Sequence, residues 1–248
     1  MDLSIFLEAS TWFSILTLTF MEIILGIDNI IFISITAGKL PSRQQGKARK
    51  IGLLIALVFR ILLLLSIKWI IGLNEPLFHI FSYGVSGRNL ILISGGLFLL
   101  AKSTVEIHHK IERSPAEKEK DDLKKAAKSS MSMIIFQIIL LDIVFSFDSI
   151  LTAVGLTPHV IIMIIAVILS MLIMMAFSGP VSHFINKHPT LQILALSFLI
   201  LIGLTLILEG MPEGLQVHVS KGYIYFAIFF SLTVEFLNIR FRTKIKKQ

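Results

Sequence analysis

The 248-residue sequence contains no cysteine, and only 16% of its residues are charged. Without cysteine there are no disulfides, no thiolate metal ligands and no thiol catalysis. The shortage of charge, together with a hydrophobic share of 55%, lies outside the usual range of soluble globular proteins. The N-terminal Met1-Asp2-Leu3-Ser4 also lacks basic residues, and no small-residue cleavage site follows the first apolar run. We therefore expect an uncleaved first span rather than a signal peptide.

Long apolar runs fill most of the chain instead. A helix needs about 20 residues to cross the hydrocarbon core of a bilayer, which is ~30 Å thick. The runs are long enough for this and predict an all-α membrane protein, with residues 1–248 forming a single transmembrane domain. We expect seven spans, at 12–36, 51–73, 89–107, 131–155, 159–178, 190–209 and 222–239.

The distribution of basic residues predicts how these spans are oriented. Lys and Arg number 23, against 16 Asp and Glu. Most of the basic residues fall after the first span, in the segment 108–130 and in the C-terminal tail. Because cytoplasmic loops collect Lys and Arg, we expect the N-terminus outside and the C-terminus inside. The net charge of +7 is thus explained by topology, and we expect the lipid bilayer, and no nucleic acid, as a partner.

One ten-residue pattern occurs twice in the sequence. The stretch from Glu22 to Ile31 and the stretch from Asp142 to Leu151 agree in residue type throughout, at an offset of 120. Each contains an acid, five further residues and then an Asp, inside a run that is otherwise apolar. The pattern indicates an internal repeat that carries charge into the membrane.

Each half of the chain contains three predicted spans, in residues 12–107 and 131–209. Because three is an odd number, the second half must enter the membrane from the opposite side, so the repeat is inverted. A charged cytoplasmic linker, 108–130, separates the halves, and the helix at 222–239 stands outside the repeat. Inverted repeats are typical of secondary transporters, whose substrate site lies near the membrane midplane.

The acids of the repeated pattern are the candidate site. An acid at the centre of a spanning helix costs about 2.5 to 3.5 kcal/mol, so such residues face an ion, a cavity or a partner. Four neighbouring carboxylates cannot all ionise without a cation, and oxygen ligands favour Mn²⁺, Mg²⁺ or Ca²⁺. We expect Gly26 and Ser146 to break their helices and turn the acids toward one cavity. The expected metal ligands are Glu22, Asp28, Asn29, Asp142, Asp148 and Ser149.

Buried ion pairs are the alternative interpretation of the acids. Arg60 lies in the middle of the second predicted span, and Lys102 lies in the third. Two basic residues do not neutralise four acids, so we expect both to act as gates or counter-charges of an ion site. Lys102 is equally compatible with a position in which it extends its ammonium to the membrane interface.

The two acidic segments, Glu22-x5-Asp28-Asn29 and Leu141-Asp142-x5-Asp148-Ser149, resemble the signature segments of the TerC family of integral membrane proteins. The stretches 196–201 and 221–226 resemble the same family, and the similarity runs over nearly the whole chain. It implies a seven-helix, multi-pass protein of the bacterial cytoplasmic (inner) membrane, related to cation transporters of the LysE type. It also implies export of manganese, or its delivery to proteins outside the membrane, with the four acids as the family's acids. The family takes its name from tellurium resistance, which no residue here explains.

We therefore expect a membrane transporter, not an enzyme, that exports Mn²⁺ through a four-carboxylate site at the midplane. The alternative is a membrane assembly or metallation factor that supports exported metalloproteins. Its secreted-protein or translocation partners would dock on the linker and the tail. A third possibility, an intramembrane aspartyl hydrolase, is disfavoured by the second acid on each helix and by the lack of a Gly-x-Gly-Asp segment.

Overall fold

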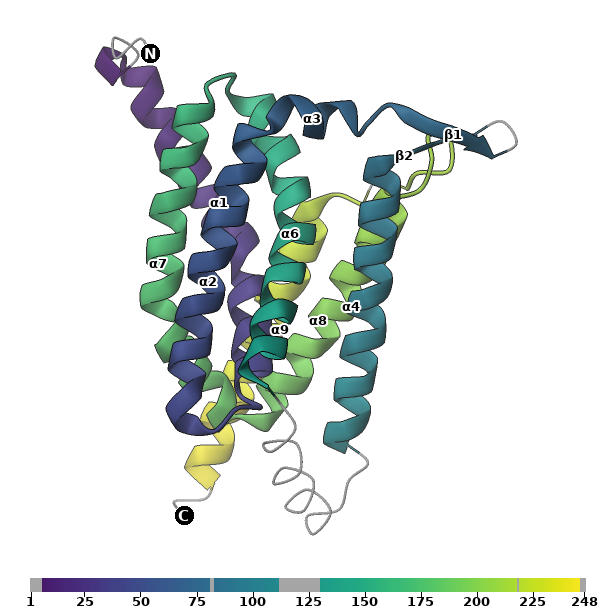
Figure 1. Cartoon of the computed structure of the whole chain (residues 1–248). Helices are drawn as coiled ribbons and strands as arrows, with labels where there is room; N and C mark the ends of the chain where they lie inside the picture. Colours follow the sequence, from purple (N-terminus) through teal and green to yellow (C-terminus); the bar gives the residue numbers. More distant parts are fainter. Residues whose placement is uncertain (1–5, 81–82, 112–129, 218, 246–248) are drawn as a thin grey trace. The chain divides into compact units, whose positions relative to one another are not determined.

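The computed structural model describes residues 6–80, 83–111, 130–217 and 219–245, without the side chains of 27, 28, 80, 148, 221 and 242–245. The described chain is almost entirely helical (Figure 1). Its elements in order are α1 (Ala9–Ala37), α2 (Ser42–Leu65), α3 (Ile67–Gly72), β1 (Pro76–Ile80), β2 (Tyr83–Ser86), α4 (Gly87–Ile111), α6 (Met131–Leu156), α7 (Val160–Lys187), α8 (Pro189–Glu209) and α9 (Lys221–Ile245).

The predicted all-α membrane class is confirmed. Among the described residues, six helices have the length and apolar composition needed to cross a membrane: α1, α4, α6, α7, α8 and α9. The second predicted span is not one of them, since α2 carries Arg49, Lys50 and Arg60. The prediction of one continuous span over 51–73 is wrong, because α2 ends at Leu65 and α3 begins at Ile67. The seventh span, the orientation and the repeat stay predictions.

A short antiparallel hairpin, β1 and β2, was not predicted. Pro76 pairs with Ser86 and His79 with Gly84, and the register shifts between Pro76 and Phe78. The hairpin gives no distinct sequence signal, because it follows an apolar run closely and has only a few residues in each strand.

The chain folds as two compact units. The first comprises Met1–Glu75 and Pro115–Phe184, and the second comprises Pro76–Ser114 and Ile185–Gln248. The first unit thus holds α1, α2, α3, α6 and most of α7, whereas the second holds the hairpin, α4, α8 and α9. Each unit takes helices from both halves of the predicted repeat. Most of the predicted linker, residues 112–129, lies outside the described residues.

In the first unit, α6 packs against both α1 and α2. The buried face of α2 includes Ala48, Gly52, Ala56 and Arg60, which recur every fourth residue and so share one side of the helix. Small residues allow a close approach here: a Cβ atom on Gly52 would lie 3.0 Å from the side chain of Ile138 on α6. The charged Arg60 therefore belongs to the face by which α2 contacts its neighbours.

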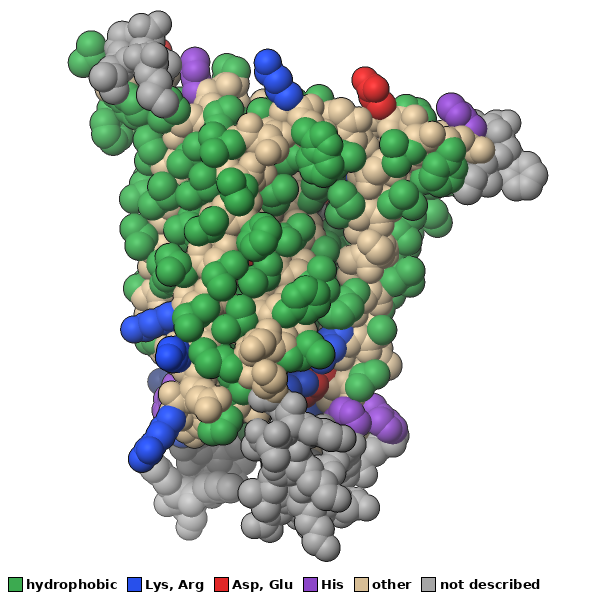
Figure 2. Space-filling model, viewed as in Figure 1, with side chains coloured by type: hydrophobic (Ala, Val, Ile, Leu, Met, Phe, Trp, Pro, Cys, Tyr) green, Lys and Arg blue, Asp and Glu red, His purple; other side chains and the backbone are tan. Residues whose placement is uncertain are grey.

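The outer faces of the helices are apolar. On α1, the side chains of Trp12, Phe13, Leu16 and Phe20 are 61 to 71% exposed. In the view of Figure 2, hydrophobic side chains cover the length of the helices. Contiguous apolar surface of this kind is rare on soluble monomers but is the expected surface toward lipid.

In the second unit, α4 and α8 are in extensive contact and approach closely at two glycines. A Cβ atom on Gly96 would lie 2.5 Å from the carbonyl oxygen of Gly203, and one on Gly203 would lie 2.9 Å from the carbonyl oxygen of Gly96. Backbone atoms cannot turn aside as the end of a side chain can. Glycine at both positions lets the two backbones meet, as small residues do in other membrane helix pairs.

Gly96→Ala is therefore expected to destabilise the protein by about 1 to 3 kcal/mol, the usual penalty for overpacking. The midpoint of unfolding by SDS in mixed micelles, followed by circular dichroism, measures the change. Gly179→Ala on α7 is the matched control, because its added Cβ would meet no atom within 4 Å among the described residues, apart from its chain neighbours and its own helix backbone. An unchanged midpoint for Gly96→Ala would contradict the close approach of α4 and α8.

Candidate cation site

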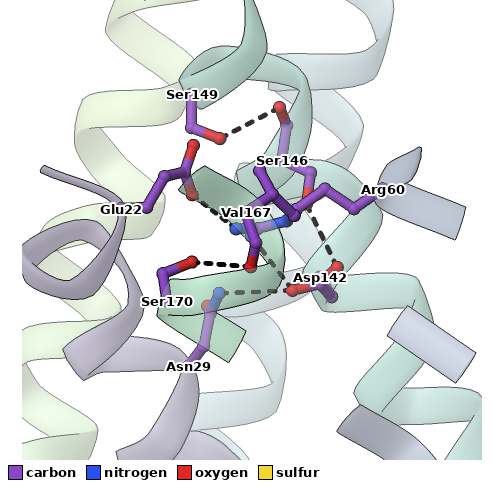
Figure 3. Close-up of polar contacts among 8 residues, drawn as sticks. All are labelled: Glu22, Asn29, Arg60, Asp142, Ser146, Ser149, Val167 and Ser170. Carbon is purple, nitrogen blue, oxygen red and sulfur yellow. Dashed lines mark hydrogen bonds and ion pairs between the residues drawn. The ribbon is translucent and has the colours of Figure 1, made fainter. Parts of the chain in front are cut away.

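A cluster of buried charged groups lies between α1, α2 and α6 in the first unit (Figure 3). Its centre is the guanidinium of Arg60, a residue that is only 2% exposed. Nη1 of Arg60 donates to Oε2 of Glu22 at 2.5 Å, and Nη2 donates to Oδ1 of Asp142 at 3.2 Å. Nε donates to Oγ of Ser146 at 2.8 Å. One side chain of α2 thus joins an acid of α1 to an acid of α6.

Polar side chains from three helices contact Asp142. Besides the bond from Arg60, Oδ2 of Asp142 accepts one from Oγ of Ser146 at 3.1 Å. Nδ2 of Asn29 lies 3.5 Å from Oδ1, which is a weak contact. Ser146 follows Asp142 by one helical turn, and Asn29 follows Glu22 by two, so each pair shares one helix face. The helical repeat of α1 and α6 therefore places these four polar side chains toward the same cluster.

The cluster carries more negative than positive charge. The carboxylates of Glu22 and Asp142 count as two formal negative charges, and the guanidinium of Arg60 counts as one positive charge. Taking such groups out of water costs several kcal/mol per ion, and their mutual pairing offsets part of this cost. The remaining negative charge makes these three groups together attractive to a cation.

Neutral oxygen atoms lie in the same region as the acids (Figure 3). Oδ1 of Asn29 is buried and has no hydrogen-bond partner among the described residues. Oγ of Ser149 donates to the carbonyl oxygen of Ser146 at 3.3 Å, and Oγ of Ser170 on α7 donates to that of Val167 at 2.9 Å. Figure 3 shows Ser170 on the side of the cluster where Asn29 lies. A hydroxyl that donates its hydrogen to the backbone keeps lone pairs for a cation, as the free amide oxygen does.

The structure thus brings Glu22, Asn29, Asp142 and Ser149 of the predicted ligand set into one region. The side chains of Asp28 and Asp148 lie outside the described residues. Within the described part of the chain, no group of three or more His, Asp or Glu residues could hold a metal by itself. The four-carboxylate arrangement therefore stays a prediction.

The two candidate counter-charges have different positions. Arg60 pairs with two of the predicted acids. Lys102 is half-buried on α4, which belongs to the second compact unit. Arg60 is therefore the basic residue on which the chemistry of the described cluster depends.

The predicted helix breaks at Gly26 and Ser146 are wrong, since α1 and α6 run through both positions without interruption. At Gly26 the missing side chain serves packing: a Cβ atom would lie 2.3 Å from Sδ of Met174 on α7. At Ser146 the hydroxyl bonds to Arg60 and Asp142 side chains. Gly26 therefore makes room for a side chain of α7, Ser146 bonds within the cluster, and both helices continue through these positions.

Two polar residues of this region, Ser146 and Ser170, were not among the predicted ligands. Ser146 was detectable, because a hydroxyl one turn after a buried acid lies on the acid's own helix face. Ser170 carries no comparable signal, since its stretch of α7 contains no charged residue. Its place near the cluster follows only from the packing of α7 against α1, where Met174 meets Gly26.

Comparison with known proteins now decides the family. The model of the "Integral membrane protein TerC family" matches residues 7–248. The chain belongs to the TerC family. It is 49% identical over 232 residues to the "UPF0053 inner membrane protein YgdQ" of Escherichia coli K12, covering 94% of each chain. It is 47% identical over 239 residues to a "UPF0053 protein" of Haemophilus influenzae, covering 96% of this chain and 98% of the relative.

A longer relative shows the same likeness over part of its length. The "UPF0053 inner membrane protein YoaE" of Escherichia coli K12 is 43% identical to this TerC family member over 232 residues, which are 94% of this chain and 43% of the relative. No solved structure matches the chain significantly. The inner-membrane relatives, the family and the six apolar helices identify a multi-pass inner membrane protein. Neither the family description nor these names describe an enzyme.

Proposed function

We propose that the protein is a transporter of divalent metal cations, and that its principal activity is export of Mn²⁺ across the cytoplasmic membrane. The observation that carries this proposal is the buried cluster of Glu22, Arg60 and Asp142, with its excess negative charge. Buried ionisable groups in membrane helices typically mark ion or substrate pathways. The free amide oxygen of Asn29 beside them adds a neutral ligand.

The ligand chemistry selects the class of ion. Carboxylate, amide and hydroxyl oxygens suit Mg²⁺, Ca²⁺ and Mn²⁺, whereas thiolate and imidazole suit zinc and copper. The described cluster contains no imidazole, and the chain contains no thiol. Asp28 and Asp148 would complete a four-carboxylate site. The preference for Mn²⁺ within this class rests on the resemblance to the TerC family.

Flux measured in proteoliposomes tests the proposal. Purified protein should carry Mn²⁺ across the bilayer faster than protein-free liposomes do, as reported by an entrapped Mn²⁺-sensitive dye. Mg²⁺ and Ca²⁺ serve as competitors to rank the ions. Folded protein that moves none of these cations would overturn the proposal and would favour the assembly or metallation factor.

Asn29→Ala should weaken the apparent affinity for Mn²⁺ without abolishing transport. Loss of one neutral ligand is expected to raise the apparent KM for Mn²⁺ about tenfold, equivalent to about 1.4 kcal/mol. The same flux assay measures KM and maximal rate. Asn238→Ala is the matched control, because Asn238 is exposed on α9 and bonds only weakly to Glu235 at 3.4 Å. Equal KM values for the two variants would remove Asn29 from the ligand set.

A further inference from the structure

We propose that Arg60 is a tethered competitor of the transported ion: it occupies the carboxylates of the empty carrier and must leave them when a divalent cation binds. This inference rests on the proposed function and assigns the group that makes the site select divalent over monovalent cations. It is carried by the contacts of Arg60 and the charges of the cluster.

Arg60 and a divalent ion compete for the same carboxylate oxygens. The guanidinium already engages Oε2 of Glu22 and Oδ1 of Asp142, at 2.5 Å and 3.2 Å. A divalent cation of this class needs carboxylate oxygens at about 2.0 to 2.6 Å. Two cations so close together on the same two carboxylates would repel each other strongly in a buried site. The site therefore holds either the arginine or the ion.

Arg60 also stabilises the two acids when the carrier holds no ion. Two buried carboxylates without a cation would each bear the full cost of desolvation. Arg60 removes that penalty, because its fork bridges both acids while Nε is held by Ser146. The rigid, planar guanidinium suits this task better than the point charge of a lysine. The empty site is thereby stable, and the carrier can return without an ion.

Competition with Arg60 makes the site select divalent over monovalent cations. An incoming Na⁺ or K⁺ brings one positive charge, the same as the arginine that it would have to displace, and it cannot replace the hydrogen bonds of the fork. A divalent ion brings two charges, which balance the formal charges of Glu22 and Asp142 once Arg60 has withdrawn. The exchange is thus favourable only for the divalent ion. Arg60 therefore lowers the affinity of the site for all cations. A divalent ion, with twice the charge, displaces the arginine more readily than a monovalent ion does.

Binding of Mn²⁺ to the full-length purified protein tests this inference, with free Mn²⁺ measured by electron paramagnetic resonance. Arg60→Gln is expected to bind Mn²⁺ at least about tenfold more tightly than wild type. Its Mn²⁺ binding should also become sensitive to excess Na⁺, and Mn²⁺ flux should fall because the ion is released slowly. Arg60→Lys keeps the charge but loses the fork, so a smaller gain in affinity is expected.

Arg49→Gln is the matched control, since it removes the same charge from the same helix and should leave the Mn²⁺ affinity unchanged. If wild type carries Mn²⁺ while both Arg60 variants bind it no more tightly than wild type, the competitor role is overturned and the transport function stands. If wild type neither binds nor carries a divalent ion, the proposed function itself fails. A purely structural Arg60 would give weaker binding in both variants. If Arg60→Gln does not fold, Arg60→Lys decides between these outcomes.

Discussion

Asp142→Asn is expected to lower the rate of Mn²⁺ transport at least about 100-fold, which corresponds to about 2.8 kcal/mol. Asp142 belongs to the cluster, where it accepts hydrogen bonds from Arg60 and Ser146. Asparagine keeps the shape of the side chain but removes its charge. The charges of Glu22 and Arg60 then cancel, so no excess negative charge remains at these three positions to attract a divalent ion. Initial rates in proteoliposomes at equal protein density measure the effect.

Glu213→Gln is the matched control for this loss of charge. Glu213 is exposed in the segment between α8 and α9, so its replacement removes one negative charge outside the cluster. Its transport rate should equal that of wild type. Size-exclusion profiles of both variants establish that they are folded. An Asp142→Asn protein that transports Mn²⁺ at the rate of the control would place the ion's path elsewhere and remove the proposed site.

The lengths of the apolar runs in the sequence made most helices predictable. The predicted span 131–155 corresponds to α6, Met131–Leu156, and the span 190–209 corresponds to α8, Pro189–Glu209. The thickness of the bilayer sets a minimum length for each apolar run, and loops rich in polar residues mark its ends. The start of α2 at Ser42 was missed because its first turns are polar and basic, a composition that apolar runs do not reveal. The break at Ser66 lies inside an apolar run and has no signal of this kind.

The candidate site was predictable in its residue types but not in its pairing. A charge in an apolar run is costly, so Glu22, Asp142 and Arg60 could each be recognised from sequence alone. That one arginine bridges both acids depends on the packing of α6 against α1 and α2, which periodicity does not determine. The role of Gly26 was misjudged for the same reason. A glycine between two acids suggests flexibility, whereas the close contact with Met174 is visible only in three dimensions.

The bridge also predicts a strong energetic coupling between Glu22 and Arg60. Arg60→Met alone should destabilise the protein by about 3 to 5 kcal/mol, because it leaves two buried acids without their partner. The double variant Glu22→Gln/Arg60→Met should be more stable than the sum of the single changes predicts, by about 1 to 3 kcal/mol. SDS unfolding midpoints in a metal-free buffer, measured for wild type, both single variants and the double variant, give the coupling energy.

The pair Glu235 and Asn238 on α9 supplies the control cycle, and its coupling should be below about 0.5 kcal/mol because one long hydrogen bond of 3.4 Å joins the two side chains and only one of them carries charge. A coupling energy near zero for Glu22 and Arg60 would contradict the buried ion pair. Added Mn²⁺ extends the same measurement. Because a ligand stabilises the state that binds it, Mn²⁺ should raise the unfolding midpoint of Glu22→Gln less than that of Arg60→Met, which keeps both acids. The stability measurements thus separate the residue that binds the ion from the residue that competes with it.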